Sequence, residues 1–258
     1  MSEFLMLGRH FSVNHVWFET AQNFPFRNHY DILIIHGNLE PCDKLGKNRC
    51  KTELQRTCIS DLTKSEEELF HLMSSSTRGH INRCIRKDVM ISAYCHEADI
   101  LTVLDNFSET YHGMFLEKGI PDKFLPLEEL KAYAHSNSLL ITTAEIDGQP
   151  VQYHAYITDK THSRLLYSCS RFRSANDELR RLTGWANDYL HWKDMLYCKQ
   201  QGIKEYDWGG ISSFENPNGI DKYKMKFGVE FREYYNITCR CSFRSKVVYQ
   251  IKHLLGKA

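Results

Sequence analysis

Residues 203–230, IKEYDWGGISSFENPNGIDKYKMKFGVE, decide the expected fold and the expected place of a site. Residues 203–208 predict a strand that ends near an acidic residue, Asp207, and a glycine pair. A loop rich in Asn, Pro and Gly follows, and then a short helical run over residues 219–226. A carboxylate at a strand end, beside glycines that let a ligand approach the backbone, is a common active-site floor. The alternative is that Asp207 only caps its loop and the glycines only form a tight turn.

The composition is that of an ordinary globular protein. The 258 residues suit one large domain or two small lobes, and 42% of them are hydrophobic and 25% charged. The formal net charge is +1, from 33 basic and 32 acidic residues, which argues against a general nucleic-acid binder. A local basic pocket for a phosphorylated small molecule stays open.

The nine cysteines are scattered, odd in number and without C-x-x-C spacing. We therefore expect free thiols in a reducing compartment. Cys239 and Cys241 would face one side of a strand as packing residues. Residues 4–7 are too short for the apolar core of a signal peptide, and no apolar run approaches the ~20 residues of a membrane span. The expected location is the cytoplasm.

Residues 1–87 are expected to form a separate N-terminal lobe, either partial and acyltransferase-like or substrate-binding. It would hold short strands and a helix that starts at a capping box, Thr63–Glu66 or Ser65–Glu68. A second helical piece, residues 77–87, carries the basic side chains Arg78, Arg83, Arg86 and Lys87. They form either a solvated helix face or an anion clamp for a substrate diphosphate, because guanidinium groups suit phosphate.

Residues 88–258 are expected to form the second domain, in which strands and helices alternate. The expected strands are 89–95, 139–146, 151–158, 164–170, 203–208 and 229–243, and the expected helices are 96–116, 127–135, 184–202, 219–226 and 245–255. Asp147-Gly148 predicts a hairpin between the second and third of these strands.

This order of elements resembles the GNAT acyltransferase fold, and three motifs resemble its Fem-type branch. The motifs are Gly184-x-x-Asn187-x-x-x-His191-Trp192, Tyr206-Asp-Trp-Gly-Gly210 and Gly219-Ile-Asp-Lys-Tyr-Lys224-x-x-Phe227-Gly228. The basic helix before the first strand of the second domain is similar to one in Fem-type proteins. The resemblance implies an α/β (α+β) fold: a GNAT-type mixed sheet flanked by helices, preceded by a smaller N-terminal α/β lobe.

Within this branch the chain looks most similar to bacterial sugar N-acyltransferases that modify amino sugars on nucleotide carriers. That resemblance implies a short acyl group, acetyl or 3-hydroxybutyryl, moved from coenzyme A by direct attack on the thioester. The acceptor would be a nucleotide-linked amino sugar, such as a dTDP-3-amino-3,6-dideoxyhexose for O-antigen or another surface glycan. Two alternatives stay open: Fem-type aminoacyl transfer from tRNA to a peptidoglycan precursor, and a non-catalytic binding module with this fold. A homodimer is left open.

The chain departs from typical GNAT enzymes at the expected coenzyme A site. The Q/R-x-x-G-x-G/A loop is absent, and an Arg-rich loop before Gly184 stands in its place. Free amides at a helix start near Gly184 would bind the pyrophosphate. An oxyanion would meet backbone N–H groups near Cys169, where the resemblance implies that two central strands splay. The expected cofactor-binding residues are Cys169, Ser170, Arg171, Arg173, Arg180, Arg181, Gly184 and Asn187.

Acyl transfer to an amine needs a base, and His154 and Asp207 are the candidates. His154 shares a strand face with Gln152 and Tyr156, and its ordinary pKa near ~6.5 suits proton removal, although it could be a structural histidine. Glu145 is a third candidate, which would more simply be an exposed hairpin residue.

The departing thiolate and the substrate need partners as well. Tyr223 or Tyr206 would protonate the thiolate, unless both are core aromatics. Lys224 would meet a substrate phosphate or carboxylate, or be a surface lysine. The expected substrate-binding residues are therefore Arg78, Arg83, Arg86, Tyr206 and Lys224. No metal is expected, because the thirteen histidines show neither H-E-x-x-H nor clustered Cys/His spacing.

Overall fold

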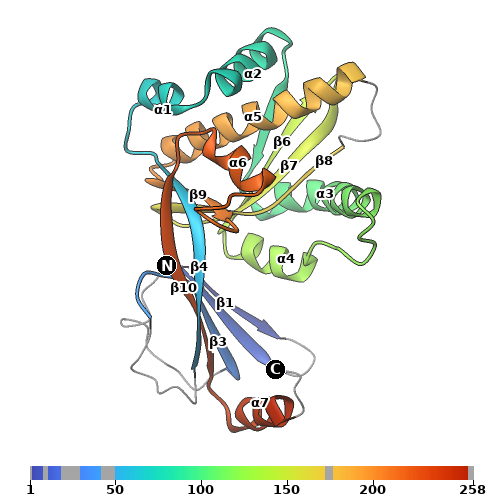
Figure 1. Ribbon diagram of the computed structural model, residues 1–258. Coiled ribbons are helices and arrows are strands. Elements are labelled where there is room, and N and C mark those ends of the chain that lie inside the picture. Colours follow the sequence, from blue (N-terminus) through green and yellow to red (C-terminus); the bar gives the residue numbers. More distant parts are fainter. Residues whose placement is uncertain (1, 8–10, 19–29, 42–49, 172–176, 255–258) are drawn as a thin grey trace. The chain divides into compact units, whose positions relative to one another are not determined.

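The computed structural model describes residues 2–7, 11–18, 30–41, 50–171 and 177–254, which form two compact units (Figure 1). The first unit combines Met1–Thr57 with Arg232–Ala258, and the second is Cys58–Phe231. This division differs from the expected 1–87 and 88–258. The chain leaves the first unit and returns to it at the end, and a linear pattern of elements does not reveal such a return.

The first unit is a sheet with a helix. Its strand order is β1 (Ser2–Leu7), β2 (Ser12–Trp17), β3 (Ile32–Asn38), β10 (Glu230–Arg240) and β4 (Cys50–Asp61). β2 and β3 are parallel, whereas β1–β2 and β3–β10 are antiparallel. Buried side chains such as Val16, Leu33 and Ile237 form its core. Helix α7 (Phe243–Leu254) follows β10.

A disulfide joins Cys50 of β4 to Cys239 of β10 in this unit, so the expectation of free thiols throughout is wrong at these two positions. The partners are 189 residues apart in sequence and come together only because β4 and β10 are neighbours. Spacing could not predict the pair, and the bond removes the argument for a reducing compartment. Of the described helices, none is long and apolar enough to cross a membrane.

The sheet of the second unit has the order β4–β9–β8–β7–β6–β5, with the last four residues of β4 at its edge. Its own strands are β5 (Met90–Tyr94), β6 (Leu139–Ile146), β7 (Gln149–Thr158), β8 (His162–Ser170) and β9 (Glu205–Gly210). Strands β5 to β8 are antiparallel, and β8 and β9 are parallel. Asp147 and Gly148 have positive φ values of 52° and 71°, as a tight hairpin turn requires, which confirms the predicted hairpin. The expected mixed sheet is confirmed.

Six helices of the second unit flank this sheet. They are α1 (Glu66–Leu72), α2 (Ser75–Arg86), α3 (Glu97–Glu117), α4 (Leu127–His135), α5 (Asp177–Gln200) and α6 (Gly219–Met225). The Ser65–Glu68 capping box at the start of α1 is confirmed. Helix α5, however, begins seven residues before the expected start at Gly184, with Asp177 and Glu178 in its first turn.

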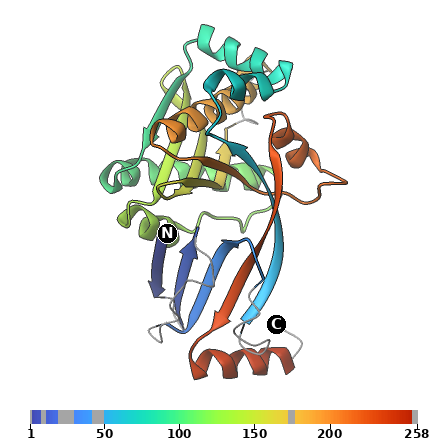
Figure 2. The same cartoon turned by 90° about the vertical axis from the view of Figure 1, so that its left-hand side faces the viewer.

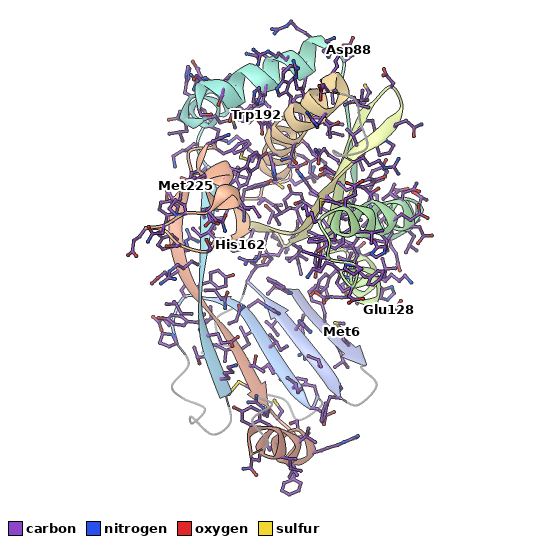
Figure 3. The ribbon with its side chains drawn as sticks, turned by 45° about the vertical axis from the view of Figure 1, so that its right-hand side comes forward. Met6, Asp88, Glu128, His162, Trp192 and Met225 are labelled. Carbon is purple, nitrogen blue, oxygen red and sulfur yellow. A yellow bond between two sulfur atoms is a disulfide. The ribbon has the colours of Figure 1, made fainter. Side chains whose placement is uncertain are left out.

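Alternate residues of β7 contact different helices, α5 and α3, which lie on the two faces of the sheet (Figure 2). The Gln152 side chain donates to the backbone carbonyl of Thr183 on α5, and His154 bonds Asp194 on α5. Tyr153 stacks instead on Phe107 of α3, with ring centroids 5.2 Å apart. Helices α5 and α3 therefore cover opposite faces, as the two-residue period of a strand requires, and the predicted shared face of Gln152, His154 and Tyr156 is confirmed. Trp192, which belongs to α5 and is labelled in Figure 3, packs on Phe70 of α1.

Strands β8 and β9 pair over three residues only. The pairs run from His162↔Glu205 to Arg164↔Asp207, and β8 then continues to Ser170 without β9 beside it. Gly209 lies at this fork with φ +75°, and a Cβ there would be 2.8 Å from the Leu165 carbonyl oxygen. Because glycine has no Cβ and adopts a positive φ readily, β9 can pass close to the backbone of β8 here and then turn away from it. The splay expected near Cys169 is present.

Candidate active site

The fork between β8 and β9 opens into a cavity of about 470 Å³, which is within the size range of small-ligand pockets. One wall is the free side of β8. Because Arg171 N–H bonds the Val151 carbonyl of β7, strand alternation points the N–H groups of Ser168 and Ser170 toward the cavity. The two N–H groups are about 6.6 Å apart along the strand, so either one of them, but not both, can donate to an oxyanion.

The imidazole of His191 lies on the opposite wall, contributed by α5. Its Nδ1 is 2.8 Å from the Tyr206 hydroxyl, so Nε2 is the nitrogen available to the cavity. Burial, reinforced by electrostatic interactions with His154 and Lys224, holds the pKa of His191 well below the usual 6.5. A neutral imidazole at the wall of a cavity is a suitable proton acceptor.

Hydrogen bonds behind His191 determine its tautomer. The Tyr156 hydroxyl donates to Asp194 Oδ2 at 2.5 Å, so in its 2.6 Å contact with Tyr206 it accepts. Tyr206 must then donate to Tyr156 and accept from His191 Nδ1–H. Nε2 of His191 consequently carries a lone pair. The hydroxyl groups of Tyr156 and Tyr206 keep their protons, because burial raises both pKa values well above 10.

His154 lies at the end of this network and does not line the cavity. It is fully buried, with Nδ1 2.7 Å from Asp194 Oδ2 and Nε2 3.0 Å from Asn187 Oδ1. Asn187 in turn donates to the Tyr223 hydroxyl at 2.6 Å. Both nitrogens of His154 are thus engaged inside the protein, and this predicted base has no nitrogen left for a substrate.

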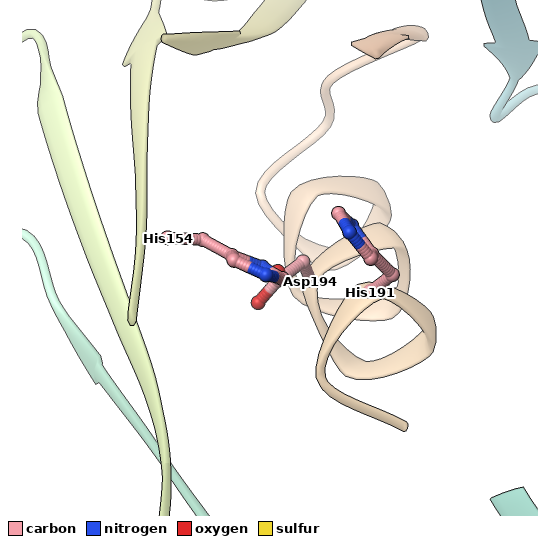
Figure 4. A group of neighbouring side chains, drawn as sticks. All are labelled: His154, His191 and Asp194. Carbon is pink, nitrogen blue, oxygen red and sulfur yellow. The ribbon is translucent and has the colours of Figure 1, made fainter. Parts of the chain in front are cut away.

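His154, His191 and Asp194 lie close enough for their ligand atoms to be considered as a metal site (Figure 4). The two imidazole rings are stacked, with centroids 4.1 Å apart. Nδ1 of each ring and Asp194 Oδ2 already have hydrogen-bond partners. These contacts make the three side chains part of a buried hydrogen-bonded network.

Asp207, the other predicted base, is likewise not among the side chains that line the cavity. It lies at the paired end of β9, where it forms an ion pair with Arg164 of β8, and Oδ1 accepts from Gly209 N–H at 2.8 Å. Asp207 therefore caps the turn at the glycine pair and links the two strands. Glu145, the third candidate, lies near Ser92 of β5 and does not line the cavity either.

Tyr223 and Lys224 of α6 do line the cavity. Burial raises the pKa of Tyr223 well above 10. The Lys224 ammonium donates to the Gly210 carbonyl at 2.7 Å, and burial lowers its pKa. Lys224 thereby ties α6 to the end of β9 and presents part of its side chain to the cavity. Tyr206 is fully buried and acts behind the wall.

The expected cofactor-binding residues are divided among three cavities. Cys169, Ser170, Gly184 and Asn187 line the main cavity, and Arg171 lines a neighbouring one together with Ser170. Arg180 and Arg181 line a third cavity, and Arg173 lies outside the described residues. The prediction that a helix starts at Gly184 is wrong. The amide of Gly184 lies inside α5 and is bonded within the helix, because the helix already starts at Asp177.

The expected arginine clamp on α2 does not reach the main cavity. Arg78 donates to the carbonyls of His71 and Met73 at the end of α1. The Arg83 guanidinium lies 5.1 Å from the centre of the Trp185 ring, and Arg86 is exposed at the end of the helix. Arg78 therefore caps carbonyl groups that α1 leaves unpaired, which is a structural use of the charge.

Sequence reasoning gave no role to His191 or Asp194. A signal was present, because positions i and i+3 of one helix share a face, and His191 and Asp194 have this spacing. What the spacing could not show is which strand faces them.

The sequence matches no known family and no curated protein. Solved structures are similar. FemX aligns with a TM-score of 0.62 at 12% identity over 96% of this chain and 85% of that one. The L-PGS of Bacillus licheniformis aligns with a TM-score of 0.55 at 14% identity, over 96% and 84%. The C-terminal domain of a putative lysylphosphatidylglycerol synthetase from Agrobacterium fabrum aligns with a TM-score of 0.54 at 12% identity, over 88% and 74%. At such identities the likeness shows the fold, and the chain has the Fem-like fold that the sequence motifs predicted.

Proposed function

We propose that the protein is an N-acyltransferase whose reaction takes place in the cavity between β8 and β9, with His191 as the general base. One observation carries this proposal. The split strands place the backbone N–H groups of Ser168 and Ser170 and a neutral, cavity-facing imidazole on walls of one cavity. Acyl transfer needs those two functions, an oxyanion site and a base, within reach of one carbonyl carbon.

In the proposed reaction, the acceptor amine attacks the carbonyl carbon of the donor while its proton passes to His191 Nε2. The oxygen of the tetrahedral intermediate accepts a hydrogen bond from the backbone N–H of Ser168 or of Ser170. Collapse of the intermediate breaks the bond to the leaving group, which takes a proton from the Tyr223 hydroxyl or from water. The hydrogen bond from Nδ1–H to the Tyr206 hydroxyl, itself held by Tyr156 and Asp194, keeps His191 in the tautomer whose Nε2 can take the proton.

We propose coenzyme A as the acyl carrier and a nucleotide-linked amino sugar as the acceptor, as the sequence resemblance implies. The acyl group would be short, acetyl or a hydroxyacyl such as 3-hydroxybutyryl. Supporting this choice, the cavity volume of about 470 Å³ leaves room for a thioester and an acceptor amine but not for two complete substrates. The carrier parts would then lie outside, along the neighbouring cavities.

Aminoacyl transfer from tRNA is the second candidate function. One observation keeps it open: the first turn of α5 carries two carboxylates, Asp177 and Glu178, which disfavour a coenzyme A pyrophosphate at this helix start. The likeness to FemX and L-PGS, which is one of fold, is compatible with either donor. The chain's net charge of +1 adds little electrostatic attraction for the phosphates of tRNA.

The test is transfer by the purified full chain. Acetyl-CoA and 3-hydroxybutyryl-CoA are each incubated with dTDP- and UDP-linked amino sugars, and thiol release and the mass of the acceptor are followed. The proposal expects release together with an acylated acceptor for at least one pair, and loss of both in His191→Gln. Aminoacyl-tRNA with the same amine acceptors is the parallel arm. Transfer in that arm alone would replace the coenzyme A assignment, and no transfer in either arm would refute the acyltransferase proposal.

A further inference from the structure

A second, smaller cavity of about 270 Å³ adjoins the main one at α2, α5 and α6. Gly184 and Tyr223 line both cavities, so the two share a wall. Gly184 contributes no side chain, so on the α5 side the shared wall consists of backbone. A volume just below the range for complete ligands suits one group of a larger molecule.

The charge of this second cavity is concentrated in three side chains, Arg180, Arg181 and Lys226. Arg180 has an exposed partner in Asp177, at 2.6 Å. Neither Arg181 nor Lys226 forms an ion pair with any residue in the described ranges. Two cations without an ion-pair partner in the described ranges, one on α5 and one directly after α6, therefore line one concave site.

The carboxylate in the lining does not cancel this charge. Asp188 has a side chain that is 6% exposed, and its Oδ2 is 2.7 Å from His80 Nδ1. The carboxylate is thus almost completely buried and already hydrogen-bonded, while the side chains of Arg180, Arg181 and Lys226 are exposed. The cavity therefore has exposed positive charge, and the carboxylate in its lining, Asp188, is already hydrogen-bonded to His80.

We infer that this second cavity binds the phosphate or diphosphate group of a substrate whose reactive end enters the main cavity past Gly184 and Tyr223. Guanidinium groups bind phosphate through paired hydrogen bonds and an ammonium adds a point charge, so two arginines and a lysine match a doubly charged anion. The inference uses the proposed function only to identify the anion as part of a substrate. The anion site itself depends on the cavity and its charges.

The experiment is binding of inorganic pyrophosphate to the full chain, by calorimetry and by the rise in melting temperature that a ligand of the folded state produces. The wild type is expected to bind. The double variant Arg181→Gln/Lys226→Gln is expected to bind at least about tenfold more weakly, because charge-assisted hydrogen bonds to phosphate are lost. Both side chains are exposed, so the variant should keep the wild-type melting temperature without ligand.

A charge-matched control separates the site from general charge effects. Arg86→Gln/Lys160→Gln removes two exposed cations that line none of the described cavities, and should leave the affinity within about twofold. Equal weakening in the two double variants, or no pyrophosphate binding by the wild type, would overturn the inference.

The source of the diphosphate is tested by titrating dTDP and dephospho-coenzyme A separately. Binding of at least one of them at least as tightly as pyrophosphate, with the same loss in Arg181→Gln/Lys226→Gln, supports a substrate site. Weaker binding of both would refute that assignment. Because these are binding measurements, pyrophosphate binding without any acyl transfer would refute the proposed function and keep the anion site. Acyl transfer without pyrophosphate binding would refute the anion site and keep the proposed function.

Discussion

The two ends of the β8–β9 pair differ in what they do. At the paired end, Arg164 and Asp207 lie on neighbouring strands with side chains only 12% and 15% exposed, and their ion pair holds the strands together. At the open end, β8 presents unpaired N–H groups to a cavity, and the titratable group, His191, comes from a helix. A carboxylate at the end of a strand can therefore hold two strands together next to a cavity without lining that cavity itself.

The largest expected effect is at the open end. His191→Gln should lower kcat/KM by about 10²–10⁴-fold, because it removes a general base while keeping a polar side chain of similar size. Near-ultraviolet circular dichroism and the melting temperature check that the variant is folded. Steady-state kinetics with the donor and acceptor identified above measure the loss.

His154→Gln is the matched comparison. His154 lies in the same network but lacks a nitrogen at the cavity, so we expect a loss nearer to tenfold, through the disturbed Asp194 and Asn187 contacts. A larger loss in His154→Gln than in His191→Gln, with both variants folded, would mean that the base has been assigned to the wrong histidine.

Much of the fold could be predicted because it depends on local patterns. The apolar spacing in α4 and β6 gave the observed bounds, and the Asp147-Gly148 turn has the backbone conformation that its residues favour. The fork between β8 and β9 was expected from family resemblance and not from any local pattern. Its physical cause, the close approach of Gly209 to the Leu165 carbonyl, depends on a contact between residues far apart in sequence.

The site was harder to predict because its geometry is set by tertiary contacts. The helix was expected to start at Gly184, after a polar Arg-rich loop, but α5 already starts at Asp177 and packs on β6 and β7. Asp207 looks the same in sequence whether a cation or a cavity lies beside it. Arg164, 43 residues earlier, decides between the two.

The fork itself should be sensitive to Gly209→Ala. The methyl group would lie 2.8 Å from the Leu165 carbonyl oxygen at a φ of +75°, so steric overlap and backbone strain together should cost about 2–4 kcal/mol of unfolding free energy. Urea denaturation measures this loss. Gly210→Ala is the control, since Gly210 is exposed and does not have a positive φ, and it should change the stability by no more than about 0.5 kcal/mol. Similar losses in both variants would show that the fork does not depend on Gly209.

At the paired end, Asp207→Asn should affect stability and leave catalysis nearly unchanged. The amide can still accept the Gly209 N–H bond, but the largely buried Arg164 loses its counter-charge, at a cost of about 1–3 kcal/mol. Urea denaturation and kinetics on the same preparation measure both quantities. If kcat falls by more than about tenfold while the stability is unchanged, Asp207 belongs to the reaction and the contrast between the two ends is lost.

The smallest expected effect is on the pH dependence of the unfolding free energy, which tests the role of His191 at the open end without a substrate. The pKa of His191 is far below 6.5 in the folded protein, so below about pH 6.5 the unfolded chain takes up a proton there that the folded chain does not. The unfolding free energy therefore falls with decreasing pH in this window, by up to about 1.4 kcal/mol per pH unit from this one group. Comparing urea denaturation of the wild type and His191→Gln at pH 7 and pH 5.5 isolates that contribution, because the other twelve histidines are common to both. The wild type should lose more stability than the variant. Parallel losses would mean that His191 is protonated as readily in the fold as in the unfolded chain, and then it could not be the neutral base that the open end requires.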